Sequence, residues 1–96
     1  MFLAGADVSS FLGFADEAAV VDKIRDGNAL LDAIEQYQKP IVAAVDGPCL
    51  GGGTELILAC HYVIASTSSR TRFSLPEVQL GLLPGLGGTV RFTERL

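Results

Sequence analysis

The sequence has few of the residues on which whole classes of function depend. Only 7 of its 96 residues are lysine or arginine, against 11 acidic residues, and the formal net charge is −4. Nucleic-acid binding needs a clustered basic face that offsets phosphate charge, so we expect no nucleic-acid partner. One histidine, two cysteines and no Cys-x-x-Cys motif leave too few ligands for a zinc site, and we expect no metal site.

Long uninterrupted apolar runs are also missing. The most apolar region, residues 40–60, is broken by Asp46, Glu55 and several glycines, so we expect no membrane span. The first residues have no basic flank and too short an apolar run for a signal peptide. These observations predict a cytoplasmic protein, or a protein of the mitochondrial matrix if a transit peptide precedes this sequence.

Apolar sequence, in contrast, is abundant. Hydrophobic residues make up 49% of a chain long enough for one small domain at most. Small domains bury a smaller share of their surface, so this composition indicates packing partners beyond the chain and thus a piece of a domain. Cys49 and Cys60 lie among apolar residues. We expect both to be reduced, buried thiols that serve packing.

Helical and strand patterns alternate along the chain, which predicts an α/β fold. Residues 1–6 are typical of a buried strand that ends in a loop. A helix is expected from Asp16 until shortly before Pro40, because the residue before a proline leaves the helical region. The apolar run 41–45 predicts a strand covered on both faces, and residues 46–48 break it. The remaining expected elements are a helix at 51–60, strands at 62–65 and 72–74, a helical turn from Pro76, a loop at 81–88 and a helix at 89–96.

The segment from Gly51 to Glu55 is the strongest candidate for chemistry. Glycines at a helix start let a ligand approach the backbone, and the free N–H groups there favour an anion, as in an oxyanion hole. Glu55 lies three residues after Gly52, on the same side of the first turn. Its apolar neighbours favour a raised pKa, which suits acid–base catalysis. The alternative interpretation is a glutamate favoured at any helix start, with glycines that only permit tight packing.

Other candidates are weaker when each is taken alone. Glu77 follows a helix-start proline and is then typical of a surface carboxylate that complements the helix dipole. Residues 85–88 lack the spacing of a dinucleotide-binding fingerprint, so no nucleotide site is expected there. Asp7 is expected to satisfy local N–H groups at the end of a strand. His61 and Tyr62 are expected to be structural.

Five short motifs gain meaning when they are read together. They are Ala4-Gly5-Ala6-Asp7, Lys39 to Gly47, Leu50 to Leu56, Leu75 to Val78, and Gly81 to Thr89. In this order and at these separations they resemble the enoyl-CoA hydratase/crotonase family, over almost the whole chain apart from residues 12–38. Residues 49–53, 59–61 and 76–85 look most like the hydratase part of the fused fatty-acid β-oxidation α subunit. In that protein a 3-hydroxyacyl-CoA dehydrogenase follows on the same chain.

The resemblance implies a crotonase-type β-β-α spiral fold, with residues 1–96 as the central part of the domain. It also implies hydration of trans-2-enoyl-CoA to 3-hydroxyacyl-CoA in fatty-acid β-oxidation, with the coenzyme A thioester as substrate and no cofactor. The backbone N–H groups of Ala6 and Gly52 match the oxyanion hole. Glu55 would take the proton from water, and Glu77 would deliver a proton to the α-carbon. The implied substrate-binding positions are Ala4, Gly5, Ala6, Gly51, Gly52, Pro76 and Gly85.

Two other functions remain open. Relatives that only shift a double bond often keep just the second glutamate, so having both Glu55 and Glu77 favours hydration over Δ3-Δ2-enoyl-CoA isomerisation. Without the neighbouring parts of the family domain, the chain could also bind acyl-CoA without turnover, and we expect the isolated 96 residues to be inactive. In the full-length protein, the resemblance implies an oligomer or a complex with a thiolase subunit.

Overall fold

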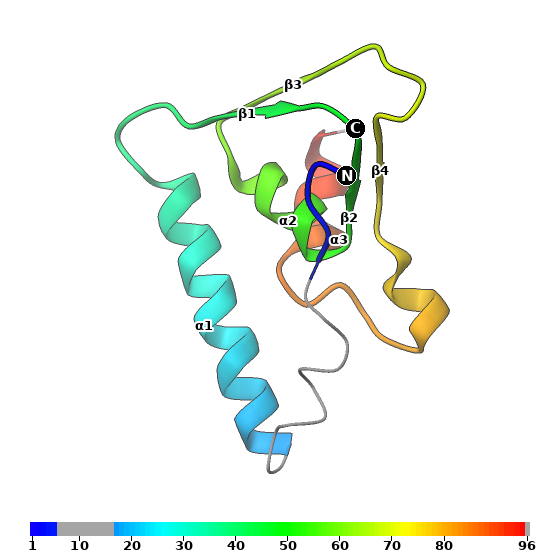
Figure 1. Cartoon of the computed structure of the whole chain (residues 1–96). Coiled ribbons are helices and arrows are strands. Elements are labelled where there is room, and N and C mark those ends of the chain that lie inside the picture. Colours follow the sequence, from blue (N-terminus) through cyan, green and yellow to red (C-terminus); the bar gives the residue numbers. More distant parts are fainter. Residues whose placement is uncertain (6–16, 96) are drawn as a thin grey trace.

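The computed structural model describes residues 1–5 and 17–95, in which helices and strands alternate (Figure 1). The elements are α1 (Glu17–Glu35), β1 (Val42–Val45), β2 (Pro48–Leu50), α2 (Gly52–Ala59), β3 (Tyr62–Ala65), β4 (Arg72–Ser74), the 3₁₀ helix η2 (Pro76–Leu80) and α3 (Gly88–Arg95). Over the described part of the chain, no helix is both long and apolar enough to cross a membrane. The expected α/β class is confirmed.

The strands form two parallel pairs, each of which encloses α2 in its connection. β1 pairs with β3, and β2 pairs with β4. Parallel strands need a crossover connection, and α2 provides it in both pairs. In Figure 1, α2 lies in the middle of the molecule, and α1 runs along one edge. α2 packs against both α1 and α3.

The strand expected at 41–45 is β1, which ends at Val45 as predicted, but the expectation that it is covered on both faces is wrong. A second strand, β2, was not expected: Pro48 is its first residue, where a missing N–H is tolerated. The Pro48 carbonyl accepts hydrogen bonds from the N–H groups of Phe2 and Leu3. β1 is buried on one face only, since the side chain of Val42 is 49% exposed. A strand was expected at residues 1–6. Among its described residues, only Leu3 makes a β-bridge, to Cys49.

The core lies between β1, β2 and α2. Its buried members are Ala43, Val45, Cys49, Ile57 and Cys60. Both cysteines are free and buried, as the sequence predicted, and burial raises the pKa of each thiol. Raised thiol pKa values make the reactive thiolate scarce, which fits packing residues.

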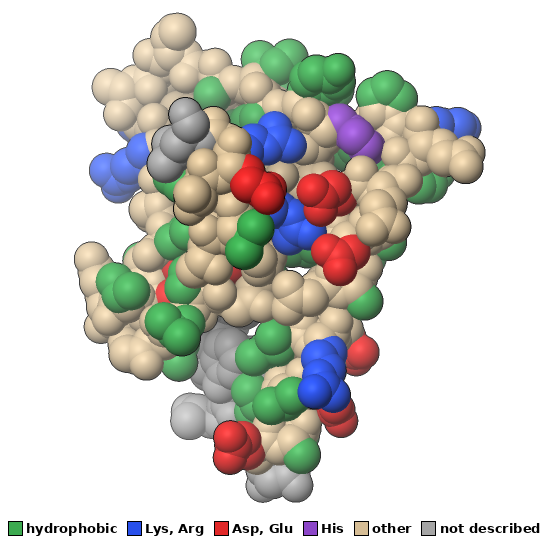
Figure 2. Space-filling model, turned by 180° about the vertical axis from the view of Figure 1, so that it is seen from behind, with side chains coloured by type: hydrophobic (Ala, Val, Ile, Leu, Met, Phe, Trp, Pro, Cys, Tyr) green, Lys and Arg blue, Asp and Glu red, His purple; other side chains and the backbone are tan. Residues whose placement is uncertain are grey.

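The surface carries acidic and basic side chains side by side. In Figure 2, basic side chains lie in small groups next to acidic ones and do not form a continuous basic stripe on this face. This arrangement agrees with the net charge of −4.

Gly53 lies where α2 meets the N-terminal segment, and we expect alanine there to destabilise the full-length protein. A β-carbon at Gly53 would lie 2.6 Å from the Leu3 carbonyl oxygen and 2.9 Å from Leu3 Cγ. The carbonyl belongs to backbone that cannot easily move, because the Leu50 N–H donates to it. Overpacking of this kind typically costs about 1–3 kcal/mol, so the Gly53→Ala unfolding midpoint should fall.

Gly27→Ala is the matched control for this prediction. A β-carbon at Gly27 would also meet an atom at 2.6 Å, but this atom is the terminal Cδ2 of the Leu86 side chain, which can move aside. Alanine is favoured over glycine inside a helix by up to about 1 kcal/mol, so this midpoint should stay or rise. Equal falls for Gly53→Ala and Gly27→Ala would contradict the prediction.

Candidate active site

The site begins at the glycine-rich start of α2. Gly51 precedes the helix with φ of +56°, a backbone conformation that favours glycine, and Gly52 is the first helical residue. The first N–H groups of a helix have no partner within it, so Gly52 presents a donor to whatever lies beyond the helix start. The N-terminal segment passes close by, since a β-carbon on Gly5 would lie 2.7 Å from the Gly52 nitrogen. Gly5 and Gly52 are therefore neighbours.

Glu55, the fourth residue of α2, is 2% exposed. Its Oε1 accepts hydrogen bonds from the N–H groups of Leu86 (2.9 Å) and Gly88 (3.0 Å). A glutamate that merely favoured its own helix start would stay near that end. The structure instead ties this carboxylate to a loop more than thirty residues further along the chain, beyond its own helix start.

The pKa of Glu55 is raised above the ordinary value of a glutamate. Burial is the largest cause, and the nearby charge of Glu77 raises the pKa further. The hydrogen bonds from Leu86 and Gly88 and the positive charge of Arg91 act in the opposite direction and reduce the shift. A raised pKa brings the carboxyl group nearer to the pH at which a cell works, which suits proton transfer. The direction is the one predicted from the apolar neighbours of Glu55.

Glu77 lies in η2, which begins with Pro76 as the sequence predicted. Without the resemblance, the sequence predicted a surface carboxylate here, and this prediction is wrong because the residue is half-buried. Its Oε2 is buried without a hydrogen-bond partner among the described residues. Its other oxygen, Oε1, lies 3.2 Å from the place where a β-carbon on Gly51 would be. Leaving a buried carboxyl oxygen without a hydrogen-bond partner is energetically costly.

Four of the predicted positions thus come together: Gly5, Gly51, Gly52 and Glu77 surround the start of α2. Ala4 precedes Gly5 on the same exposed segment, and Pro76 precedes Glu77. Gly85 packs elsewhere, against Ile24 of α1, and its carbonyl accepts a hydrogen bond from Asn28 (2.7 Å). Ala6 and Asp7 lie outside the described residues.

The two side chains expected to be structural, His61 and Tyr62, differ in their surroundings. His61 Nδ1 accepts a hydrogen bond from the Ile41 N–H at 2.9 Å, which joins α2's exit to the entry of β1. Tyr62 is exposed on the outer face of β3. Across residues 1–5 and 17–95, no group of three acidic, histidine or cysteine residues could hold a metal ion.

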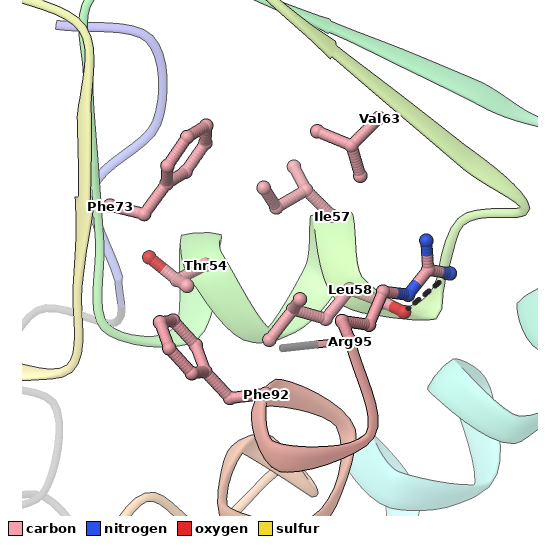
Figure 3. Close-up of a pocket in the computed structure, with 7 residues that line it drawn as sticks. All are labelled: Thr54, Ile57, Leu58, Val63, Phe73, Phe92 and Arg95. Carbon is pink, nitrogen blue, oxygen red and sulfur yellow. Dashed lines mark hydrogen bonds between the residues drawn. The ribbon is translucent and has the colours of Figure 1, made fainter.

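An apolar pocket of about 340 Å³ lies apart from the two glutamates (Figure 3). Phe73 and Phe92 flank Thr54 there, and Arg95 closes one end. The hydroxyl of Thr54 is shared between the carbonyl oxygens of Cys49 and Ser74, so it is not available for chemistry. The pocket offers no acid–base group. The lining residues are Thr54, Ile57, Leu58, Val63, Phe73, Phe92 and Arg95.

Sequence reasoning missed the residues that hold Glu55 in place. The N–H donors of Leu86 and Gly88 belong to the glycine-rich loop, in which only Gly85 was expected to have a role in the site. Arg91, which follows this loop on α3, is 8% exposed and was not singled out. A basic residue three positions after a Gly-Gly pair, at a predicted helix start, was the available signal.

Comparisons with known proteins show the family of the chain. Residues 1–96 match the family described as enoyl-CoA hydratase/isomerase. The fatty acid oxidation complex subunit alpha of Idiomarina loihiensis is 48% identical over 93 residues, and that of Vibrio parahaemolyticus is 50% identical over 92 residues. These matches cover 97% and 94% of this chain but 13% of each relative. The chain therefore spans about an eighth of the length of these curated relatives.

Solved structures show the same fold. The enoyl-CoA hydratase of Bacillus anthracis is 37% identical with a TM-score of 0.79, and that of Polaromonas sp. JS666 is 33% identical with a TM-score of 0.81. The matches cover 95% and 97% of this chain and 34% and 36% of those chains. The described elements are thus part of a crotonase-type α/β fold, and the resemblance to the fatty-acid oxidation α subunit is confirmed. The chain belongs to the enoyl-CoA hydratase/isomerase family.

Proposed function

We propose that the protein containing this chain hydrates trans-2-enoyl-CoA to 3-hydroxyacyl-CoA in fatty-acid β-oxidation. One observation carries the proposal: the carboxyl groups of Glu55 and Glu77 lie near each other, so that the charge of Glu77 raises the pKa of Glu55. Glu77 also keeps a buried oxygen without a partner among the described residues, at the glycine-rich start of α2. Such a pair can hold a water molecule and divide the roles of acid and base.

In this mechanism, Glu55 takes a proton from the water molecule as its oxygen bonds to the β-carbon. The Cα=Cβ electron pair moves toward the thioester, whose oxygen becomes an enolate oxygen. The N–H groups of Gly52 and Ala6 stabilise that negative charge. Glu77 then delivers a proton to the α-carbon, and the thioester carbonyl re-forms. The product has gained one water molecule, and a proton passes from Glu55 back to Glu77, directly or through solvent, before the next turnover.

The substrate positions follow from the same arrangement. Gly51 and Gly52 have no side chains, so a thioester can approach the helix start closely. The neighbouring backbone of Ala4, Gly5 and Ala6 would contact the coenzyme A part, and Pro76 would border the acyl group. Coenzyme A thioesters are the substrate in this scheme, and the two carboxyl groups need no cofactor for water addition.

The surroundings of the full-length protein are part of the proposal. The curated relatives are α subunits of a fatty acid oxidation complex, and they come from bacteria. Their names support an assembly with other subunits, for which we infer a thiolase, and a location in the bacterial cytoplasm. We further infer that residues 1–96 are the central part of a hydratase domain, with a 3-hydroxyacyl-CoA dehydrogenase on the same chain.

A second activity, Δ3-Δ2-enoyl-CoA isomerisation, is favoured by the family's description, which includes isomerases. Analysis of the products formed by the full-length protein separates the two. With trans-2-enoyl-CoA, hydration gives 3-hydroxyacyl-CoA, and with a 3-enoyl-CoA, isomerisation gives the trans-2 isomer. We expect hydration as the main activity. Isomerisation alone would contradict the proposal, and acyl-CoA binding without any product would show a binding protein.

A further inference from the structure

One edge of α1 is turned toward the loop that holds Glu55. Asn28, Asp32 and Glu35 are spaced four and three residues apart, so they lie along one face of the helix. Asn28 Nδ2 donates to the Gly85 carbonyl, and both carboxylates form ion pairs with Arg91 of α3. α1 therefore binds both ends of the segment from Gly85 to Arg91 through a hydrogen bond and two ion pairs.

Arg91 is the centre of this contact. Its Nη2 lies 2.8 Å from Asp32 Oδ1 and 2.9 Å from Glu35 Oε2, and its Nε lies 3.2 Å from the same Glu35 oxygen. The side chain is buried, whereas those of Asp32 and Glu35 are more than half exposed. A planar guanidinium group held by two carboxylates has a fixed orientation, which a lysine ammonium would not have.

The third guanidinium nitrogen of Arg91, Nη1, contacts Leu86, whose backbone N–H donates to Glu55. Nη1 donates to the Leu86 carbonyl at 3.1 Å. The N–H of the same residue, Leu86, donates to Glu55 Oε1 at 2.9 Å. The contacts from α1 to Glu55 thus pass through the side chain of Arg91 and the backbone of Leu86. The loop has little freedom elsewhere, since the Arg91 N–H also donates to the Gly87 carbonyl.

We propose that Arg91 is a positioning residue for Glu55, anchored by Asp32 and Glu35 and acting through the backbone of Leu86. The inference rests on the proposed function of Glu55 as the base. It gives a role in the reaction to α1, the part of the chain that the five motifs do not cover.

Two consequences follow for an active enzyme. Loss of Arg91 frees Leu86, so the Glu55 carboxylate is misplaced, and misplacement by about 1 Å can cost on the order of 10²-fold in rate. Loss of its charge also raises the pKa of Glu55, because Arg91 lowers that pKa while burial and Glu77 raise it. Among the described residues, Glu77 and Arg91 are the charged groups that shift the pKa of Glu55. If Glu55 must be ionised, the acid limb of kcat/KM then moves to higher pH.

The test compares Arg91→Met, Arg91→Lys and Arg95→Met in the full-length protein, with hydration kinetics across pH and thermal unfolding. Arg95 is the matched control: it lies one turn further on α3 and donates to the carbonyls of Leu58 and Cys60, not to Leu86. Arg91→Met should lower kcat on the order of 10- to 10²-fold with little change in KM, and shift the acid limb upward. Arg91→Lys keeps the charge, so its acid limb should stay near that of the wild type while kcat falls. Arg95→Met should lower stability alone.

The outcomes separate the inference from the proposed function. An active wild type in which Arg91→Met behaves like Arg95→Met would overturn the positioning role, because only stability would then depend on Arg91. A wild type without hydratase activity would overturn both. If Arg91→Met does not fold, the double variant Asp32→Asn/Glu35→Gln takes its place, since it removes two exposed anchors and leaves Arg91. A fall in kcat at unchanged KM supports the inference, and an unchanged kcat overturns it.

Discussion

Glu55→Gln and Glu77→Gln, each in the full-length protein, are expected to lower kcat for hydration of a short trans-2-enoyl-CoA by ~10²–10⁴-fold, the usual contribution of general acid–base catalysis. Glutamine preserves the shape of either side chain, and its amide oxygen can still accept the N–H groups that hold Glu55. It cannot exchange a proton. KM should change little, because coenzyme A affinity comes mostly from contacts elsewhere.

Glu94→Gln is the control for these two variants. Glu94 is an exposed glutamate on α3, so the same substitution there should leave kcat at the wild-type value. The pH profile gives a second check. Because the pKa of Glu55 is raised, the base loses its ionised form at a higher pH than an ordinary glutamate would. As the pH is lowered, activity should therefore begin to fall at a higher pH than the pKa of an ordinary glutamate. A near wild-type kcat in either variant would favour a structural carboxylate at that position.

Gly88→Ala is expected to lower kcat on the order of 10²-fold, the cost of a small misplacement of a catalytic group. A β-carbon at this position would lie 2.8 Å from Glu55 Oε1 and 2.9 Å from its Cγ. Both distances are shorter than non-bonded contacts allow. Glu55 is buried, and the added methyl group would occupy the place of its carboxylate, so the carboxylate must turn away from the Leu86 and Gly88 N–H groups.

The measurement is steady-state hydration together with circular dichroism, which checks that the fold is kept. Val90→Ala, two residues further on the exposed side of α3, is the matched control and should retain the wild-type kcat. A folded Gly88→Ala variant with wild-type kcat would show that Glu55 does not need the position seen here. The role assigned to the loop around Leu86 would then be wrong as well.

The sequence predicted those parts of the site that depend on local pattern. The glycine-rich start of α2 and the proline that opens η2 are short-range signals, and both were found where expected. The direction of the pKa shift of Glu55 also followed from its apolar neighbours. The resemblance supplied the pairing of Glu55 with Glu77, which no local pattern could give, because 21 intervening residues separate them.

Long-range contacts explain what the sequence could not predict. β2 is three residues long, contains a proline and exists because it pairs with β4 some twenty residues later. The exposed face of β1 depends on which elements cover it, and a run of apolar residues does not tell one covered face from two. Arg91 looks like an ordinary charged residue of a short helix. Its importance comes from Asp32 and Glu35, more than fifty residues earlier.

The double variant Glu55→Gln/Glu77→Gln provides the most direct test that the two glutamates act together on one water molecule. The hydration rate of the full-length protein would be measured for the wild type, both single variants and the double variant. Residues that act as a unit show strongly non-additive losses, so the double variant should be little slower than the slower single variant. A loss equal to the product of the two single losses would contradict a shared water molecule, because each glutamate would then act independently.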